Sequence, residues 1–401
     1  MNQRMVGLLG PALVAGVAYL DPGNVASNMT AGARYGYLLV WVVVLGNLMA
    51  WLVQYLSAKL GVVTGQSLPE ALGARFRSPW TRRAYWLQAE AVAMATDIAE
   101  IIGGAIALWL LFGVPLVIGG AITGCVSLLM LSVRGARRFE IVISALIMII
   151  VLGFITGLVV QPPSIAPAID GLVPRFAGID SVLLATSILG ATIMPHAIYA
   201  HAGLSRDRHR TGSVPTSGAI DTLLRAQRWD VTVAMIIAGA VNLGLLLLAA
   251  SALYGAAGTD SLEGAHANIA ATLGPVVATL FAVGLLASGL ASSAVGAYAG
   301  SEIMTGLIRR SIPMWLRRLV TMVPALALLA LGVEPTSALV WSQVVLSFGI
   351  PFAIIPLVRL TSDAAVLGRW HNRPATRLLG WLAAGSVSAV NVGLLILAAL
   401  R

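Results

Sequence analysis

The stretch LLGPALVAGVAYLDPGNVASNMTAG, residues 8–32, decides the fold, because Asp21-Pro22-Gly23-Asn24 interrupts a long apolar run in its middle. Proline removes a backbone donor and pushes the residue before it out of the helical region, and glycine lowers helix stability. A carboxylate near the midplane of a bilayer costs roughly 2.5–3.5 kcal/mol on insertion scales. The stretch therefore predicts a membrane-spanning helix that is broken near the midplane, with an acid at the break.

The composition indicates that lipid surrounds most of the chain. Of 401 residues, 58% are hydrophobic and 10% are charged, whereas soluble domains have roughly a quarter of charged residues. The mean hydropathy is +0.91. The one cysteine, Cys125, lies in an apolar run, so we expect a packing residue and no disulfide. We expect no cleavable signal peptide, because the first apolar run holds Asp21 and lacks a small-residue cleavage pattern.

Eleven spanning helices are predicted, since each needs about 20 mostly apolar residues. Their expected ranges are 6–33, 37–61, 84–111, 115–133, 139–160, 181–203, 231–254, 275–307, 315–332, 336–358 and 377–400. We interpret residues 1–401 as a single transmembrane domain of an all-α integral membrane protein.

The distribution of Lys and Arg predicts the orientation. With a cytoplasmic N-terminus, all of them except Arg34, Arg175 and Arg401 fall in cytoplasmic connections or helix ends, as the positive-inside rule requires. We therefore expect a multi-pass protein of a bacterial plasma membrane with its C-terminus outside. The net charge of +9 is then explained by the Lys and Arg residues on the cytoplasmic side. No nucleic-acid partner is expected.

A second break lies at the matching place in the sixth span, SVLLATSILGATIMPHAIYAHAGL (181–204), at Gly190 and Met194-Pro195-His196. Five spans separate the two broken helices, so they run in opposite directions. This pattern predicts an inverted repeat of helices 1–5 (about 6–160) and 6–10 (about 181–358), followed by an additional helix (about 377–400). Paired interrupted helices in inverted halves indicate the binding site of a transporter.

Residues at the two breaks form a candidate cation site. Asn24 adds an amide oxygen one turn after Asp21, Met194 adds a thioether, and the carbonyls of Ala18 and Ala191 are natural further ligands. Oxygen donors alone would suit Mg²⁺, Ca²⁺ or Na⁺, whereas a thioether favours softer first-row metals and Cd²⁺. The mixture predicts Mn²⁺ or Fe²⁺, with Co²⁺ and Cd²⁺ as related ions, carried as substrates. No cofactor is expected.

The motifs DPGN (21–24) and MPH (194–196) resemble the signatures of the Nramp family of proton-coupled divalent-metal transporters. Further stretches similar to this family are QAEAVAMATDIAE (88–100), GLLASGLASSAVG (284–296), WLRRLVTM (315–322) and SQVVLSFGIPFA (342–353). The resemblance covers essentially the whole chain and is closest to bacterial manganese transporters. It implies a LeuT-type fold and import of Mn²⁺ and Fe²⁺ with protons by alternating access. It also implies the ligands named above, and adds Gln343 in some conformations.

Charged residues of the third and ninth spans are candidates for a proton pathway that also includes Asp21. Glu90, Asp97 and Glu100 are separated by seven and three residues, which places them on one helical face. Three acids on one membrane-embedded face suggest a water-accessible relay. Arg317 and Arg318 begin the ninth span, where they could be interfacial anchors. The resemblance pairs this region with the acids and favours Arg318 as a buried partner.

Four further polar residues are weaker candidates. His196 and His201 follow the second break; a lone membrane histidine is usually a packing donor, but the resemblance favours His196 in proton transfer and leaves His201 open. Thr192 and Asn242 are possible gating residues or supports of the ligands.

Three alternatives remain at this point. A LeuT-type symporter of another cation or a small organic substrate would need no soft ligand at its breaks. An intramembrane metalloenzyme would be expected to show His pairs at ligand spacing, and a passive channel would need no inverted pair of broken helices. We expect metal ions, protons and lipid as partners, and no obligate protein partner.

Overall fold

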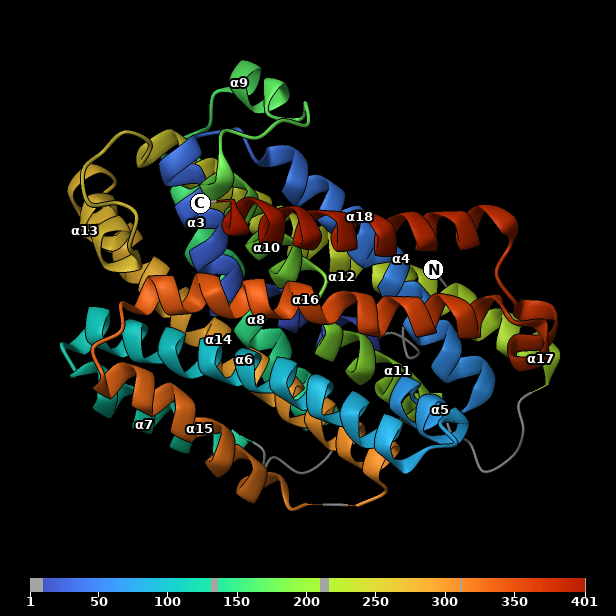
Figure 1. The fold of residues 1–401 in the computed structure, drawn as a ribbon. Helices are drawn as coiled ribbons and strands as arrows, with labels where there is room; N and C mark the ends of the chain where they lie inside the picture. The colour runs from blue at the N-terminus through green and yellow to red at the C-terminus, as the bar shows by residue number, and fades with distance from the viewer. Residues whose placement is uncertain (1–9, 131–135, 210–215, 311, 401) are drawn as a thin grey trace.

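Helices form almost all of the structure, a computed structural model that describes residues 10–130, 136–209, 216–310 and 312–400 (Figure 1). The first half contains α2 (Pro11–Gly16), the 3-10 helix η1 (Val17–Leu20), α3 (Pro22–Tyr35), α4 (Val40–Thr64), α5 (Leu68–Arg75), α6 (Pro79–Phe112), α7 (Leu116–Met130), α8 (Ala136–Val160) and α9 (Ile165–Asp170). The second half contains α10 (Ile179–Thr192), α11 (Pro195–His209), α12 (Ser217–Ala252), α13 (Leu262–Thr272), α14 (Pro275–Ile303), the π-helix η2 (Met304–Ile308), α15 (Met314–Ala330), α16 (Pro335–Ser362), α17 (Ala364–Leu367), η3 (Gly368–Trp370) and α18 (Pro374–Ala399).

Each of the eleven predicted spans coincides with a helix or a pair of helices. Within the described ranges, seven helical segments are long and apolar enough to cross a membrane: α4, α6, α10 with α11, α12, α14 with η2, α16 and α18. The other four spans correspond to α2 with α3, α7, α8 and α15. Residues 6–9 of the first predicted span and 131–133 of the fourth lie outside the described residues.

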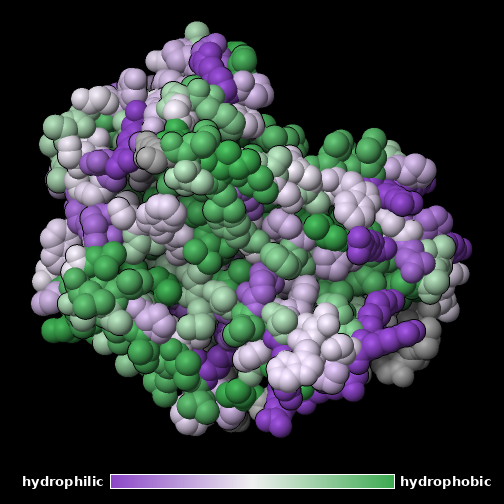
Figure 2. Space-filling view, viewed as in Figure 1, coloured by the Kyte–Doolittle hydropathy of each residue, from purple (hydrophilic) through white to green (hydrophobic). Residues whose placement is uncertain are grey.

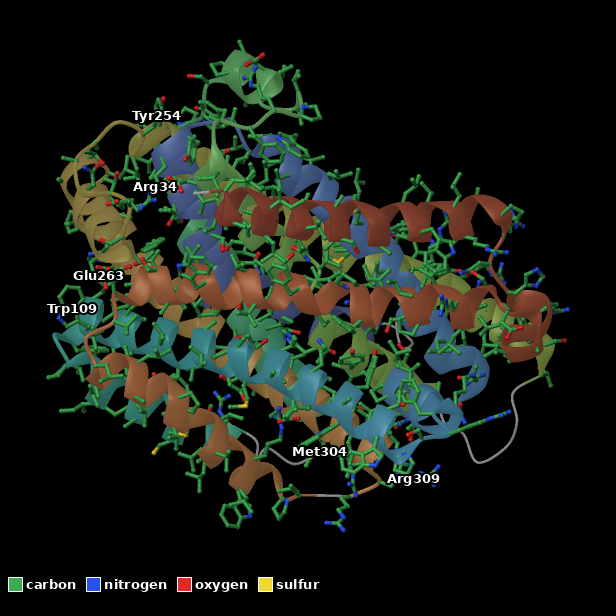
Figure 3. The ribbon with its side chains drawn as sticks, viewed as in Figure 1. Arg34, Trp109, Tyr254, Glu263, Met304 and Arg309 are labelled. Atoms are coloured by element: carbon green, nitrogen blue, oxygen red, sulfur yellow. The ribbon has the colours of Figure 1, made fainter. Side chains whose placement is uncertain are left out.

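Most of these helices run along one common direction, so the bundle has two ends (Figure 1). One end carries α9 and α13, and the other carries α5 and α17. Hydrophilic side chains gather at both ends, with a mostly hydrophobic surface between them (Figure 2). Arg34, predicted to lie outside, and Arg309, predicted to lie inside, are at opposite ends (Figure 3), as the charge pattern requires.

Both predicted helix breaks are confirmed. The first span passes from α2 through one 3-10 turn to Asp21, whose backbone is extended (φ −71°, ψ 163°), before α3 begins at Pro22. The sixth span leaves helical geometry at Ile193 (φ −119°, ψ 61°) and resumes at Pro195. Prolines at the first helical position tolerate the missing donor, so both prolines start new helices after the break.

The seventh helix is longer than the apolar segment expected to span the membrane. The seventh helix begins at Ser217, well before the expected 231, and Thr216 caps it by accepting the backbone N–H of Ala219. The early part contains charged residues, including Asp221, Arg225 and Arg228, and therefore lies outside the expected apolar span. It is an extension of the helix beyond the apolar segment, where charged side chains remain accessible to water.

Glycines allow two pairs of helices to approach closely at the breaks. A Cβ atom added to Gly190 of α10 would lie 1.9 Å from the backbone oxygen of Gln343 in α16. A Cβ atom on Gly103 of α6 would lie 2.1 Å from the Pro22 ring, immediately beside Asp21. These contacts are closer than any real Cβ contact, so α10 approaches α16, and α6 approaches the start of α3, only because these positions lack a side chain.

This packing predicts that Gly190→Ala destabilises the protein, because the new methyl group must push α16 away from α10. Overpacking of this kind costs about 1–3 kcal/mol. Thermal unfolding of the purified protein should show a clear decrease in the midpoint. Gly385→Ala is the matched control, since this glycine of α18 has no atom within 4 Å of the added Cβ. Equal midpoints for the two variants would contradict the close approach of α10 and α16.

Candidate functional site

Asp21 lies at the N-terminus of α3 with its carboxylate fully buried. Its Oδ1 accepts the Asn24 backbone N–H at 2.7 Å and the Asn24 side-chain amide at 2.9 Å. Its Oδ2 accepts the side-chain amide of Gln343, from α16, at 3.2 Å. The positive end of the helix dipole also favours an anion at this position. The break in the first span thus provides the polar partners that a buried carboxylate requires.

The amide nitrogen of Asn24 connects the two breaks. It donates to Asp21 Oδ1 and, at 2.8 Å, to the backbone carbonyl of Ala191 in α10. The oxygens of the two amides, Asn24 Oδ1 and Gln343 Oε1, are buried without a hydrogen-bond partner. Partly positive N–H groups therefore occupy the place where a cation would contact the same carboxylate and carbonyl. Rotation of either amide would exchange its N–H groups for an oxygen ligand.

The remaining predicted ligands belong to the same two interruptions. Met194 is fully buried in the gap between α10 and α11, three residues after Ala191. The Ala18 carbonyl accepts the backbone N–H of Asp21 at 3.3 Å. The structure thus joins Asp21, Asn24, Ala191 and Gln343 directly by hydrogen bonds, and places Ala18 and Met194 beside them in the chain.

This cluster differs from a site made of several acidic or imidazole ligands. Within the described part of the chain, no three His, Cys, Asp or Glu side chains are grouped so that they could hold a metal ion. The cluster has one carboxylate, two amides, a thioether and backbone carbonyls.

Helices α12 and α14 support the first break. The side-chain amide of Asn242 donates to the Tyr19 carbonyl at 2.9 Å, and the hydroxyl of Ser288 donates to the Leu20 carbonyl. These bonds satisfy carbonyls that a continuous helix would have paired. Asn242 therefore stabilises the backbone beside Asp21. Thr192 instead donates to Ile188 within its own helix, at 2.6 Å, and makes no hydrogen bond to the ligand cluster.

Arg318 holds two of the three predicted acids in a second buried cluster. Its Nη1 donates to Asp97 Oδ1 at 2.5 Å and to Glu100 Oε2 at 3.1 Å. Its other donors reach the hydroxyls of Ser127 and Ser293 at 2.9 and 2.8 Å. All three charged side chains are at most 2% exposed. With both acids ionised this cluster has one unbalanced negative charge, which one proton would neutralise.

Arg317 pairs with the third acid, Glu90, at 2.8 Å. Both arginines are buried, at 7% and 2% exposure, so neither is an interfacial anchor. Glu90 lies seven residues before Asp97 in α6, about 10 Å along the helix, towards the end where α6 begins. Of the three acids of α6, Glu90 therefore pairs with Arg317, and the other two pair with Arg318.

His196 connects the second break to this charged helix. Its Nδ1 lies 3.1 Å from the hydroxyl of Thr96, the neighbour of Asp97 in α6. Its Nε2 is buried and has no hydrogen-bond partner. His196 thus links the second break to the neighbour of Asp97 in α6.

His201 belongs to a different set of contacts. Its Nδ1 lies 2.6 Å from Gln54 Oε1, and the Gln54 amide donates to the hydroxyl of Tyr19. It therefore packs beneath the first break and makes no contact with the acids of α6.

Sequence reasoning missed several polar residues that hold the two clusters in place. Gln54, Thr96, Ser127 and Ser293 lie inside apolar spans, and a polar residue at such depth was the available signal. Asp230 was also missed: its Oδ2 accepts the backbone N–H groups of Gly10 and Ala12 at 3.1 and 2.9 Å. This acid of α12 therefore caps the start of α2.

Comparison with known proteins shows the family of this chain. A family model described as natural resistance-associated macrophage protein-like (Nramp) matches residues 12–397. The chain is 58% identical over 393 residues to a protein of Mycobacterium tuberculosis named divalent metal cation transporter MntH, covering 97% of this chain and 91% of that protein. It is 46% identical to the protein of the same name from Aeromonas hydrophila, covering 97% and 95% of the two chains.

A solved structure shows the same fold. The crystal structure of the Eremococcus coleocola manganese transporter in complex with an aromatic bis-isothiourea substituted compound superimposes with a TM-score of 0.85 at 32% identity. The match covers 96% of this chain and 85% of that one. With the family model matched over nearly the full length, this chain belongs to the Nramp family.

Proposed function

We propose that this protein imports Mn²⁺, Fe²⁺ and related divalent metals such as Co²⁺ and Cd²⁺, together with protons, across a bacterial inner membrane by alternating access. The observation that supports this proposal most strongly is the buried carboxylate of Asp21, which shares the Asn24 amide with the Ala191 carbonyl of the opposite break. The names of the relatives, divalent metal cation transporter and manganese transporter, agree with it.

The ligand set explains the choice of cargo. Asp21 supplies the only carboxylate of the cluster, Asn24 and Gln343 supply amide oxygens, and the carbonyls of Ala18 and Ala191 complete the oxygen donors. Met194 supplies a thioether, a ligand that binds Mg²⁺ and Ca²⁺ poorly and first-row metals or Cd²⁺ better. Because the same cluster combines hard and soft donors, it favours transition metals over the more abundant alkaline earths.

The positions of the ligands explain how access could alternate. The ligands lie at interruptions of two antiparallel spans, so each half-helix can tilt separately about the non-helical residue at its break. We infer that helices 1–5 (about 6–160) and 6–10 (about 181–358) are inverted repeats and that α18 is the additional helix. The Lys and Arg distribution supports a cytoplasmic N-terminus and an external C-terminus.

Protons take a route along α6 in this proposal. A divalent ion at Asp21 displaces any proton held there, and His196, at the second break, contacts Thr96, the neighbour of Asp97 in α6. Asp97 and Glu100 share Arg318 and have one unbalanced negative charge, so they can accept that proton. Glu90 with Arg317 continues the route towards the end of the bundle where α6 begins. His201 has no part in it, and Thr192 and Asn242 act only on the backbone around the breaks.

Replacement of Asp21 by Asn should abolish Mn²⁺ uptake, because the cluster would lose its only negative charge. Loss of one partner from a buried ion pair costs about 3–5 kcal/mol, so Mn²⁺ binding should weaken by at least about 100-fold. Uptake into proteoliposomes and equilibrium binding to the purified protein measure both effects. Asp260→Asn, at an exposed pair with Arg34, is the control. Normal uptake by Asp21→Asn would exclude a metal site at this break.

Replacement of Met194 by Ala should change selectivity more than Mn²⁺ transport. Cd²⁺ uptake should decrease by about tenfold, since Cd²⁺ depends more on a soft ligand, and Ca²⁺ or Mg²⁺ should begin to compete. Competition assays in proteoliposomes test this expectation. Met235→Ala, a similarly buried methionine of α12, controls for lost packing. If Ca²⁺ and Mg²⁺ compete no better with Met194→Ala than with the wild type, selectivity arises elsewhere.

Replacement of Asp97 by Asn should separate proton flow from metal binding. The variant keeps the shape of the side chain but leaves Arg318 with one carboxylate, so metal-stimulated proton influx should decrease by at least about tenfold. Equilibrium Mn²⁺ binding should weaken only modestly, because Asp97 makes no hydrogen bond to the Asp21 cluster. A pH-sensitive dye and a binding assay on the same preparation give both values. Parallel loss of binding and proton flow would show that Asp97 belongs to the metal site.

A further inference from the structure

A cavity of about 620 Å³ opens between α4, the start of α12 and the start of α18, away from both sites described above. It lies at the end of the bundle that carries α17 (Figure 1). Four basic side chains line it: Lys59, Arg228, Arg369 and Arg373. They come from three separate parts of the chain, so the fold brings these charges together.

Most of this positive charge is not balanced by acids. Arg369 pairs with Asp221 at 2.6 Å, and Asp221 also accepts the indole N–H of Trp370. Among the side chains that the structure describes, Lys59, Arg228 and Arg373 form no ion pair with a carboxylate. Lys59 is only 7% exposed, and its ammonium donates to the Asn372 side-chain oxygen at 2.9 Å. A buried ammonium with only a neutral partner favours an anion nearby.

The backbone adds donors to the same cavity. Helix α18 begins here, and no side chain caps its N-terminus. Residues 375 and 376 of its first turn line the cavity. Unpaired N–H groups and the positive end of the helix dipole bind phosphate and other anions. The charges and the helix start therefore converge on one anionic group.

The walls of the cavity indicate that this anion is part of a lipid. Leu52, Leu224 and Leu379 form an apolar side of the cavity. Leu379 is 54% exposed, and Leu382, one turn further along α18, is 58% exposed. Only 28% of the apolar segment of α18 is buried inside the protein. Most of this segment therefore faces the surroundings. An apolar path for an acyl chain thus leads from the cavity along the outer face of the bundle.

Aromatic residues place the cavity at the level of lipid head groups. The rings of Trp51 and Tyr55 stack at 6.2 Å, and the Arg228 guanidinium lies 5.9 Å from the Trp51 ring centre. Trp and Tyr are enriched where the hydrocarbon core meets water. Basic pockets between spanning helices at this level recognise acidic head groups.

We propose that this cavity binds the phosphate head group of an anionic phospholipid such as phosphatidylglycerol. Lys59, Arg228 and Arg373 bind the phosphate together with the first turn of α18. An acyl chain lies along Leu379 and the exposed face of α18. The bound lipid joins α18 to α4 and α12 and stabilises their arrangement. This proposal is independent of the metal that the protein carries.

The test compares two double variants of the full-length protein that remove equal charge from the same helices. Arg228→Gln with Arg373→Gln removes two cavity residues, whereas Arg225→Gln with Arg377→Gln removes two arginines that do not line it. Native mass spectrometry with added phosphatidylglycerol measures binding. The cavity variant should bind on the order of 10- to 30-fold more weakly than the wild type, and the control should bind like the wild type.

Further binding and unfolding measurements identify the ligand and control for folding. Phosphatidylcholine should bind weakly, and millimolar inorganic phosphate should not displace phosphatidylglycerol. Arg228→Lys with Arg373→Lys should retain binding, and thermal unfolding should confirm that each variant is folded. Comparing the single variant Arg373→Gln with Arg377→Gln gives the same test with one substitution in each protein. Equal losses in cavity and control variants, equal binding of phosphatidylcholine, or displacement by phosphate would each overturn the proposal.

Discussion

Asp21 places a fully buried carboxylate inside the bundle, and the packing around the breaks follows from the need to stabilise it. The helix must end there so that the N–H groups of α3 point at the carboxylate. Gln343 must also reach it from α16, and a Cβ atom on Gly23 would lie 1.7 Å from the Gln343 amide nitrogen. Glycine at 23 and 190 thus lets α3 and α10 approach α16. The polar contacts of one carboxylate and the close packing of three helices depend on each other.

The second buried cluster, around Arg318, stabilises its carboxylates in a different way. Asp97 and Glu100 are stabilised by a full positive charge on Arg318, whereas Asp21 has only neutral donors around it. A carboxylate beside neutral donors can exchange them for a cation, while one beside an arginine already has its counterion. This difference is the physical basis of the separate roles that we propose, with cargo at the breaks and proton transfer along α6. Thr96 and His196 form one contact between the second break and α6, beside Asp97.

The sequence was sufficient to predict the eleven spans and both breaks, because proline, glycine and an acid inside apolar runs have strong local effects. It also indicated the candidate ligands Asp21, Asn24 and Met194. Gln343 followed only from the family resemblance, since nothing near it in the chain connects α16 to Asp21. The long start of α12 was missed because charged residues suggest a loop, although they also suit a helix that extends into water. The partners of Arg318 in α7 and α14 depend on tertiary packing, which no local pattern contains.

The most direct test of the account is the position of a bound metal ion. Crystals of the protein grown with Mn²⁺ and measured at the manganese absorption edge would show where the ion binds. If the metal binds at the breaks, one anomalous peak lies between them, within ligand distance of Asp21, Asn24, Met194 and the Ala191 carbonyl. A peak beside Asp97 and Glu100, or the absence of any peak between the breaks at saturating Mn²⁺, would contradict it.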